Sequence, residues 1–254
     1  MVIALTRSVP PTITGCELTH LAREPIDHTR AVEQHAAYEQ ALTRLGCRVE
    51  RLPDLPELPD SVFVEDTAIV LDDLAVIAHP GAWSRRAEVA SVVHALQRYR
   101  DAACIEPPAT LDDGDVLLAG RMLYVGLSAR TNAEAVRQLG ALLSPRGYTI
   151  TPVRVNGCLH LKSAVTLASQ DTVVINPGWI DQTFFDGFHT IQVDPTEPLA
   201  ANVLRVGGVT LCAAAYPRTR ARLEAGGVRT EALEASEVAK AEGALTCCSI
   251  IFNT

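Results

Sequence analysis

One sequence pattern constrains the fold more than any other: polar residues recur at the start of short apolar segments. Each of these segments is followed by a short loop and a second apolar segment, which together predict a β-hairpin. The pattern returns about every 40 to 50 residues, a period typical of an internal structural repeat. The polar groups that open the segments are Glu65-Asp66, Asp112–Asp115, His160–Lys162, Ala201-Asn202 and Cys247-Cys248.

Four hairpins are complete, and a fifth is divided between the two ends of the chain. The complete hairpins are predicted at Thr67–Ala78, Val116–Leu127, Ala164–Ile175 and Val203–Cys212. The last apolar segment, Ser249–Phe252, has no partner after it, but Val2–Leu5 resembles the second strand of the other hairpins. We therefore predict that the N-terminal and C-terminal strands pair and close a ring of repeats, as in propeller-like folds.

A helical stretch and a lone strand complete most repeats. Apolar spacing predicts helices at His28–Leu45, Ser84–Tyr99 and Thr131–Leu143, and weaker ones at Asp181–Phe185 and Thr219–Glu224. The lone strands are predicted at Arg48–Leu52, Ala103–Glu106, Thr149–Val155, Thr190–Val193 and Val228–Leu233. The unit is therefore ββαβ, and the fold class predicted is α/β, a five-bladed propeller in one domain over residues 1–254. Residues 16–27 are longer than a tight connection and are a candidate lid.

The amino-acid composition limits the classes of partner and the cellular compartment that we expect. The net charge is −8 without any basic cluster, so we expect neither nucleic acid nor an anionic membrane as a partner. We see no apolar run long enough to span a bilayer and no secretion signal in Met1–Arg7. The seven cysteines show no metal-binding spacing, so we expect reduced thiols in a cytoplasmic protein.

The polar groups in equivalent repeat positions include the parts of a nucleophilic cysteine hydrolase. Taken singly, Cys247 is more often a buried structural thiol, His160 a core histidine and Asp112 a turn residue. If the repeats surround an axis, however, thiol, imidazole and carboxylate converge there. In a strand, Cys247 and Cys248 would point to opposite faces, so one would face the axis and the other the core.

The remaining charges point to a substrate that is cationic at one end. Asp60, Glu65, Asp66 and Asp115 are more acids than a triad needs, and carboxylates bind a planar guanidinium in bidentate fashion. Two arginines, Arg85 and Arg130, follow second strands at equivalent repeat positions. They are either surface residues at helix starts or a pair that binds a substrate carboxylate.

At this point the chain resembles a known family. Its motifs are similar to those of dimethylarginine dimethylaminohydrolases, which belong to the guanidino-modifying or pentein superfamily, and the resemblance extends over essentially the whole chain. The motifs are Phe63–Asp66, Leu111–Val116, Gly126–Asn132, Leu159–Ser163 and Leu245–Ser249.

The resemblance implies a five-bladed α/β propeller and hydrolysis of Nω-methylated arginine to citrulline and methylamine or dimethylamine. It implies that Cys247 is the nucleophile that forms a thiouronium, that His160 is the general acid and base, and that Asp112 orients the histidine. It implies substrate binding by the following residues: Asp66 and Glu65 at the guanidinium, Asp60 at the amino-acid end, Arg85 and Arg130 at the α-carboxylate, and Leu18 and Ala241 through their backbones. Two departures from the family pattern, Asp113 and Ala241, bear on specificity.

The alternatives are an arginine deiminase or another guanidino or ureido hydrolase of the same superfamily, and a non-catalytic arginine-binding module. Cys247 and His160 argue against the binding module, which needs neither, and the lack of an inserted helical domain argues against a deiminase. A cysteine protease is disfavoured because nothing predicts a groove for an extended peptide. A zinc site is disfavoured because further ligand spacing is absent. We expect no cofactor, a small-molecule substrate, and either a monomer or a homodimer.

Overall fold

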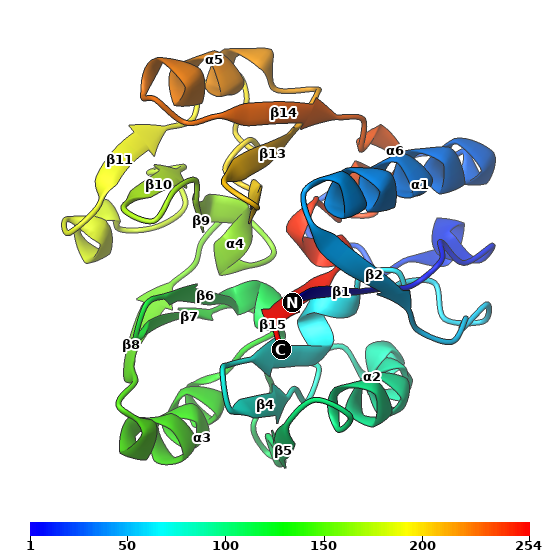
Figure 1. Cartoon of the computed structure of the whole chain (residues 1–254), viewed down its shortest axis with the longest axis vertical. Helices are drawn as coiled ribbons and strands as arrows, with labels where there is room; N and C mark the ends of the chain where they lie inside the picture. Colours follow the sequence, from blue (N-terminus) through cyan, green and yellow to red (C-terminus); the bar gives the residue numbers. More distant parts are fainter.

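Fifteen short strands form five separate three-stranded sheets in a computed structural model that describes residues 1–254 (Figure 1). In chain order, the strands are β1 (Val2–Thr6), β2 (Cys47–Arg51), β3 (Ala68–Val70), β4 (Leu74–Ile77), β5 (Asp101–Cys104), β6 (Val116–Ala119), β7 (Met122–Leu127), β8 (Thr149–Arg154), β9 (Val165–Leu167), β10 (Thr172–Ile175), β11 (His189–Gln192), β12 (Leu204–Val206), β13 (Val209–Ala213), β14 (Thr230–Leu233) and β15 (Ile250–Asn253).

All five sheets share one pairing pattern. The middle strand is antiparallel to the strand before it, with which it forms a hairpin, and parallel to the lone strand that returns after the connection. The same pattern holds across the chain ends, where β1 is antiparallel to β15 and parallel to β2. The predicted hairpins, lone strands and pairing of the two terminal strands are therefore confirmed.

The five sheets lie around a common centre, with the two chain ends side by side near the middle of the view (Figure 1). The first strand of each hairpin lies inward, so that β9 has β6 and β12 as neighbours and β15 has β3. Hydrogen-bonded pairing stays within each group of three strands, and no sheet closes on itself. The structure therefore supports repeated α/β sheets, while the closed propeller stays a prediction.

Four helices on the outside of the ring each connect the middle strand of a sheet to the lone strand of the same sheet (Figure 1). They are α1 (His28–Arg44), α2 (Val89–Leu96), α3 (Ala133–Leu143) and α5 (Pro217–Ala225). The short α4 (Leu161–Ala164) and α6 (Ser236–Ala239) lie instead between one sheet and the next along the chain. The Asp27 and Asn132 side chains cap α1 and α3 by accepting hydrogen bonds from backbone N–H groups of the first turn. None of the helices is long and apolar enough to cross a membrane.

Two predicted helices are shorter or tighter than expected. The prediction for Ser84–Tyr99 was wrong at its start, because η3 (Trp83–Glu88) is a 3₁₀ helix and only α2 is α-helical. Asp181–Phe185 likewise forms the 3₁₀ helix η6 (Gln182–Phe185) rather than an α-helix. The guanidinium of Arg85 in η3 donates to carboxylates and carbonyls across the site, and these contacts accompany the tighter turn.

One turn of helix comes before the first strand in four of the five sheets. These turns are η2 (Val64–Thr67), η4 (Asp113–Asp115), α4 and η7 (Thr246–Cys248), and they carry the repeated polar groups. The expectation that Cys247 and Cys248 alternate along a strand was therefore wrong, since β15 begins only at Ile250. The helical turns lead into the inner strands, which brings their side chains together near the centre.

Candidate active site

Cys247 and His160 line the same small cavity, although 87 positions in the sequence separate them. The predicted residues that also line this cavity are Asp60, Asp66, Arg85, Arg130 and Ala241. The Cys247 side chain comes from η7 and His160 from the residue that precedes α4. Thiol, imidazole and carboxylates therefore meet as the repeat predicted.

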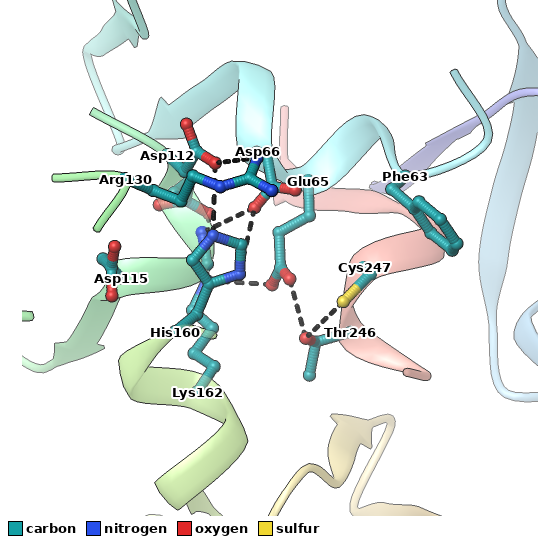
Figure 2. Close-up of polar contacts among 12 residues, drawn as sticks. Phe63, Glu65, Asp66, Asp112, Asp115, Arg130, His160, Lys162, Thr246 and Cys247 are labelled. Carbon is teal, nitrogen blue, oxygen red and sulfur yellow. Dashed lines mark hydrogen bonds and ion pairs between the residues drawn. The ribbon is translucent and has the colours of Figure 1, made fainter. Parts of the chain in front are cut away.

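His160 is held between two carboxylates (Figure 2). Its Nε2 lies 3.2 Å from Oδ2 of Asp112, and its Nδ1 lies 3.8 Å from Oδ1 of Asp66. Burial lowers the pKa of His160, but Asp66, Asp112 and Asp115 outweigh burial and raise it to about 9. The ring is therefore an imidazolium at neutral pH and can deliver a proton.

Asp112 and Asp66 are themselves fixed by backbone donors. The Gly81 N–H donates to Oδ1 of Asp112 at 2.9 Å, and the Gly114 N–H donates to Oδ1 of Asp66 at 3.0 Å. A side chain at position 114 would place its Cβ 2.5 Å from Nδ1 of His160, so only glycine lets this turn approach the imidazole. Burial raises the pKa of Asp66, but His160 and Arg85 outweigh it and lower the pKa to about 2. Asp66 is therefore a carboxylate in the resting site.

Asp115 lies behind His160 rather than in the cavity. It accepts hydrogen bonds from the Leu161 N–H and the Ser128 hydroxyl, at 2.9 and 2.6 Å. Burial raises its pKa to about 6 against the opposing effect of His160 and its hydroxyl donors. Asp115 thus supports the turn at the start of α4 and does not face the substrate space.

The Cys247 thiol is protonated when the site is empty. Burial raises its pKa well above the ordinary value, and the Glu65 and Asp66 carboxylates raise it further. Cys248, on the same turn, belongs to the hydrophobic core, and its Sγ lies 3.5 Å from the Ala244 carbonyl oxygen. A cation must therefore enter the cavity before Cys247 becomes a good nucleophile.

The two predicted arginines differ in how strongly the protein already holds them. The Arg85 guanidinium pairs with Asp66 and Glu88 and donates to the Phe63 carbonyl at 2.8 Å. Arg130 has only a 3.7 Å ion pair to Asp112 and a 3.4 Å hydrogen bond to the Thr19 hydroxyl. Arg130 therefore has more freedom to bind a ligand carboxylate than Arg85.

A second charged cluster, which we call the Lys162 cluster, comprises Lys162, Glu65 and Asp113. Nζ of Lys162 lies 2.8 Å from Oε1 of Glu65 (Figure 2). It also lies 2.9 Å from Oδ2 of Asp113. Glu65 also accepts a 2.7 Å hydrogen bond from the hydroxyl of Thr246, the neighbour of the nucleophile. Glu65, predicted to bind the guanidinium, lines a different cavity from Cys247 and is paired with Lys162 instead.

Comparison with known proteins agrees with this arrangement. The family described as "N,N dimethylarginine dimethylhydrolase, eukaryotic" matches residues 20–186. The dimethylarginine dimethylaminohydrolase of Streptomyces coelicolor is 39% identical over 97% of this chain and 95% of its own length. The enzyme of the same name from Pseudomonas aeruginosa is 34% identical over 94% of both chains.

The chain belongs to the dimethylarginine dimethylaminohydrolase family. Its fold is similar to that of the Pseudomonas aeruginosa enzyme solved as a cysteine-to-serine variant with citrulline, with a TM-score of 0.94, 33% identity and 98% of each chain covered. A dimethylarginine dimethylaminohydrolase structure with an S-methyl-L-thiocitrulline adduct gives a TM-score of 0.93, with 99% of this chain and 100% of that chain covered. An arginine dihydrolase domain from cyanobacteria, 17% identical with a TM-score of 0.85, shares the fold.

Five further residues line the cavity of this family member and were not predicted. They are Glu17, Phe63, Leu159, Glu242 and Gly243. A side chain at Gly243 would place its Cβ 2.2 Å from the Phe63 ring, so the ring packs directly on this backbone. Phe63 and Leu159 are the first residues of two recognised motifs, Phe63–Asp66 and Leu159–Ser163, and that membership was the signal for them. Glu242 had no sequence signal, because its position depends on contacts with a segment more than 200 residues away.

The predicted lid, residues 16–27, has no regular secondary structure and is fixed to the rim of the cavity. The Glu17 N–H donates to Oδ2 of Asp60 at 3.1 Å, and the Ser84 hydroxyl donates to the Glu17 carboxylate at 2.7 Å. Leu18 is half-buried against the core beneath α1, and its side chain does not line the cavity. Its proposed backbone contact with substrate stays a prediction.

The site of this family member contains one group of potential metal ligands. Donor atoms of Asp66, Asp112 and His160 lie within 4.8 Å of one another. Asp66 is paired with Arg85, and Arg130 lies 3.7 Å from Asp112. Both arginines already carry positive charge beside these carboxylates, so the arrangement suits a cationic organic group hydrogen-bonded to carboxylates better than a metal ion.

Proposed function

We propose that this protein hydrolyses Nω-methylated L-arginine to citrulline and dimethylamine or methylamine, acting on the C–N bond of a linear amidine. The observation that supports this most is the convergence of Cys247, the His160 imidazolium and the Asp66 carboxylate on one cavity. We also propose that the ring of five sheets is a closed five-bladed propeller, with β1 and β15 completing the last blade. Family membership supports both proposals.

Substrate binding prepares the nucleophile. Burial and the nearby carboxylates raise the pKa of Cys247, so the empty site avoids a reactive thiolate. A guanidinium bound to Asp66 brings positive charge beside Sγ, which lowers the thiol pKa and favours release of its proton to solvent. The substrate cation thus activates the group that attacks it. The amine product, which leaves as a neutral molecule, takes up one proton in solution, so the overall proton count balances.

The first half-reaction exchanges a C–N bond for a C–S bond. The Cys247 thiolate attacks the guanidinium carbon and forms a tetrahedral adduct. The His160 imidazolium donates its proton to the methylated nitrogen, which leaves as a neutral amine. The remaining adduct is a covalent S-alkylthiouronium, and His160 is left as a neutral imidazole.

The second half-reaction uses the same imidazole as a base. His160 takes a proton from water as the water oxygen attacks the thiouronium carbon, and this regenerates the imidazolium. Collapse of the second adduct breaks the C–S bond, and the remaining hydroxyl proton passes to the departing sulfur. Citrulline is released and the thiol is restored. Asp112 keeps the ring oriented through both proton transfers, at 3.2 Å from Nε2.

The amino-acid end of the substrate is assigned to Arg130 and Asp60, which line the same cavity. Arg130 is the better placed of the two arginines to bind the α-carboxylate, because its guanidinium is held only loosely. Asp60 lines the same cavity and can accept from the α-ammonium group. We assign Arg85 chiefly to fixing Asp66, with which it pairs.

The test is product release from asymmetric dimethylarginine, monomethylarginine and arginine, with Cys247→Ser as the matched loss of nucleophile. We expect citrulline and amine from both methylated substrates and a fall in turnover of at least roughly 10³-fold in Cys247→Ser. Cys248→Ser is the control and should keep most activity. Release from arginine alone would assign the protein to the deiminases, and normal turnover by Cys247→Ser would overturn the mechanism.

A further inference from the structure

The carboxylate of Glu242 binds three consecutive backbone N–H groups of the lid. The Thr19 N–H donates to Oε2 at 2.9 Å, and the N–H groups of His20 and Leu21 both donate to Oε1, the latter at 2.5 Å. Hydrogen bonds to a charged acceptor are roughly twice as strong as neutral ones. No other contact of the lid places three donors on one side chain.

The Glu242 backbone is held in an unfavourable conformation. Its φ of +56° makes it the one non-glycine residue with a positive φ in the chain. Left-handed backbone is unfavourable for a residue with a side chain, because its Cβ approaches the neighbouring carbonyl oxygen. The conformation is maintained by the turn after α6, where the N–H groups of Glu242 and Gly243 donate to Ala239 and Val238. This turn directs the carboxylate toward the lid.

Glu242 also stands between two cavities of different size. With the lid in place, the cavity that contains Cys247 has a volume of about 20 Å³, room for roughly one water molecule. The neighbouring cavity, of about 370 Å³, is lined by His20 and Leu21 of the lid and shares Leu159, Glu242 and Gly243 with the first. A substrate the size of methylarginine therefore enters only if the wall between the cavities moves.

We propose that Glu242 is the latch of the lid, a positioning residue that holds Thr19–Leu21 closed over the cavity and whose release joins the site to the larger neighbouring cavity. The Arg130 hydrogen bond to the Thr19 hydroxyl lies at the same part of the lid. Closing the latch therefore also places the lid against the residue that we assign to the substrate carboxylate. The kinetic part of this proposal rests on the proposed function.

The positive φ of Glu242 determines which substitutions test the latch. Glu242→Gly removes the carboxylate while a glycine keeps the positive φ without strain, and Glu242→Gln keeps one acceptor oxygen but removes the charge. The control is Glu234→Gln, which makes the same change of charge at the wall of the larger cavity. Glu234 makes no contact with the lid and has a long ion pair, 3.9 Å, to Arg30 in α1.

The first measurement is amide hydrogen exchange in the free enzyme. Glu242→Gly should accelerate exchange at Thr19, His20 and Leu21 by at least about tenfold, because three charge-assisted hydrogen bonds are lost. The Glu17 amide, which Asp60 holds, should be much less affected. Glu242→Gln should give a smaller acceleration and Glu234→Gln none. Unchanged exchange in Glu242→Gly, or equal acceleration in Glu234→Gln, would overturn the latch.

The second measurement tests gating without needing turnover. Alkylation of Cys247 by iodoacetamide, followed by mass spectrometry, should become about tenfold faster in Glu242→Gly and stay unchanged in Glu234→Gln. With a methylarginine substrate, Glu242→Gly should raise KM about tenfold and change kcat much less, because the chemical groups are intact. Faster amide exchange with unchanged alkylation and KM would refute gating. Absence of turnover in the wild type would instead refute the proposed function and leave the exchange and alkylation results valid.

Discussion

Two charged clusters lie close together and differ in how closely their charged groups are paired. The His160 cluster comprises His160, Arg130, Asp66 and Asp112 around a cavity, and two of its contacts are long, at 3.7 and 3.8 Å. Of its ion pairs, only the 3.2 Å contact of His160 with Asp112 and the pairing of Asp66 with Arg85 are close. In the Lys162 cluster, one ammonium lies 2.8 and 2.9 Å from Glu65 and Asp113, so two acids share a single cation. Burial and the neighbouring Glu65 raise the pKa of Asp113 well above its ordinary value, although Lys162 opposes this. Loosely paired charges beside a cavity can still interact with a substrate, which suits a reaction site. Tightly paired buried charges destabilise the fold when one partner is removed, which suits a structural role.

Two neighbouring residues, Asp112 in the His160 cluster and Asp113 in the Lys162 cluster, should differ most in their effect on turnover. Asp112→Asn should reduce kcat by roughly 10³-fold, because an amide neither stabilises the imidazolium nor fixes its orientation. Asp113→Asn should leave kcat within about threefold, because Asp113 contacts Lys162 rather than His160. Steady-state kinetics of both variants provides the check. Equal losses would mean that the two clusters act as one site.

The Lys162 cluster should matter more for stability than for catalysis. Lys162→Met leaves the Glu65 and Asp113 carboxylates buried without a cation, and we expect a loss of about 3 kcal/mol in the free energy of unfolding. Chemical denaturation at neutral pH measures this. Asp113→Asn is the matched control, since Lys162 keeps Glu65, and it should cost about 1 kcal/mol. A loss in Lys162→Met no larger than in the control would contradict the structural role.

The two arginines differ in the same way, since the Arg130 guanidinium is loosely held and the Arg85 guanidinium is fully paired. Arg130→Ala should raise KM for methylarginine by roughly 10 to 100-fold with a small change in stability, because it removes a charged contact to the ligand. Arg85→Ala should instead lower stability, since Asp66 and Glu88 lose their buried partner. KM and denaturation midpoints are measured on both variants. A purely kinetic effect of Arg85→Ala would place it beside Arg130 as a ligand-binding residue.

The smallest expected effect is on pH dependence. The pKa of His160, about 9, lies above its ordinary value of 6.5. Its stabilising contribution should be complete below about pH 6.5 and lost as the pH rises through about 9. NMR titration of the imidazole should give this value in the wild type and in Asp113→Asn alike. A change of more than about half a pKa unit in Asp113→Asn would show that the clusters are electrostatically coupled.

The strands and their pairing could be predicted from the sequence because both depend on local patterns. Apolar runs with Gly or Asp between them predicted the hairpins, and the missing partner of Ser249–Phe252 pointed to Val2–Leu5, which β15 and β1 confirm. Helix type was less predictable, because contacts of Arg85 with distant groups accompany the 3₁₀ turn at Trp83–Glu88. One domain over residues 1–254 stays a prediction.

Much of the candidate site was also recognisable from residue types and spacing. Cys247, His160, Asp66 and Arg130 line one cavity, as the repeat and the family motifs predicted. Glu65 was placed at the substrate but pairs with Lys162, since two acids adjacent in sequence lie on different sides of a helical turn. The sequence motifs identify the residues of the site, but the helical turn on which they lie determines the direction of each side chain.

The sequence by itself therefore determined the repeat, the strand pairing across the termini and the reactive groups. Hairpin signals and nucleophile chemistry are properties of short segments. Only the tertiary structure decided which arginine is loosely held, which carboxylates raise the pKa of Cys247, and that Glu242 reaches Thr19–Leu21. Each of these properties depends on contacts between segments that are far apart in the chain. Contacts of a few ångströms determine the protonation state of the site residues and the access of substrate to the cavity.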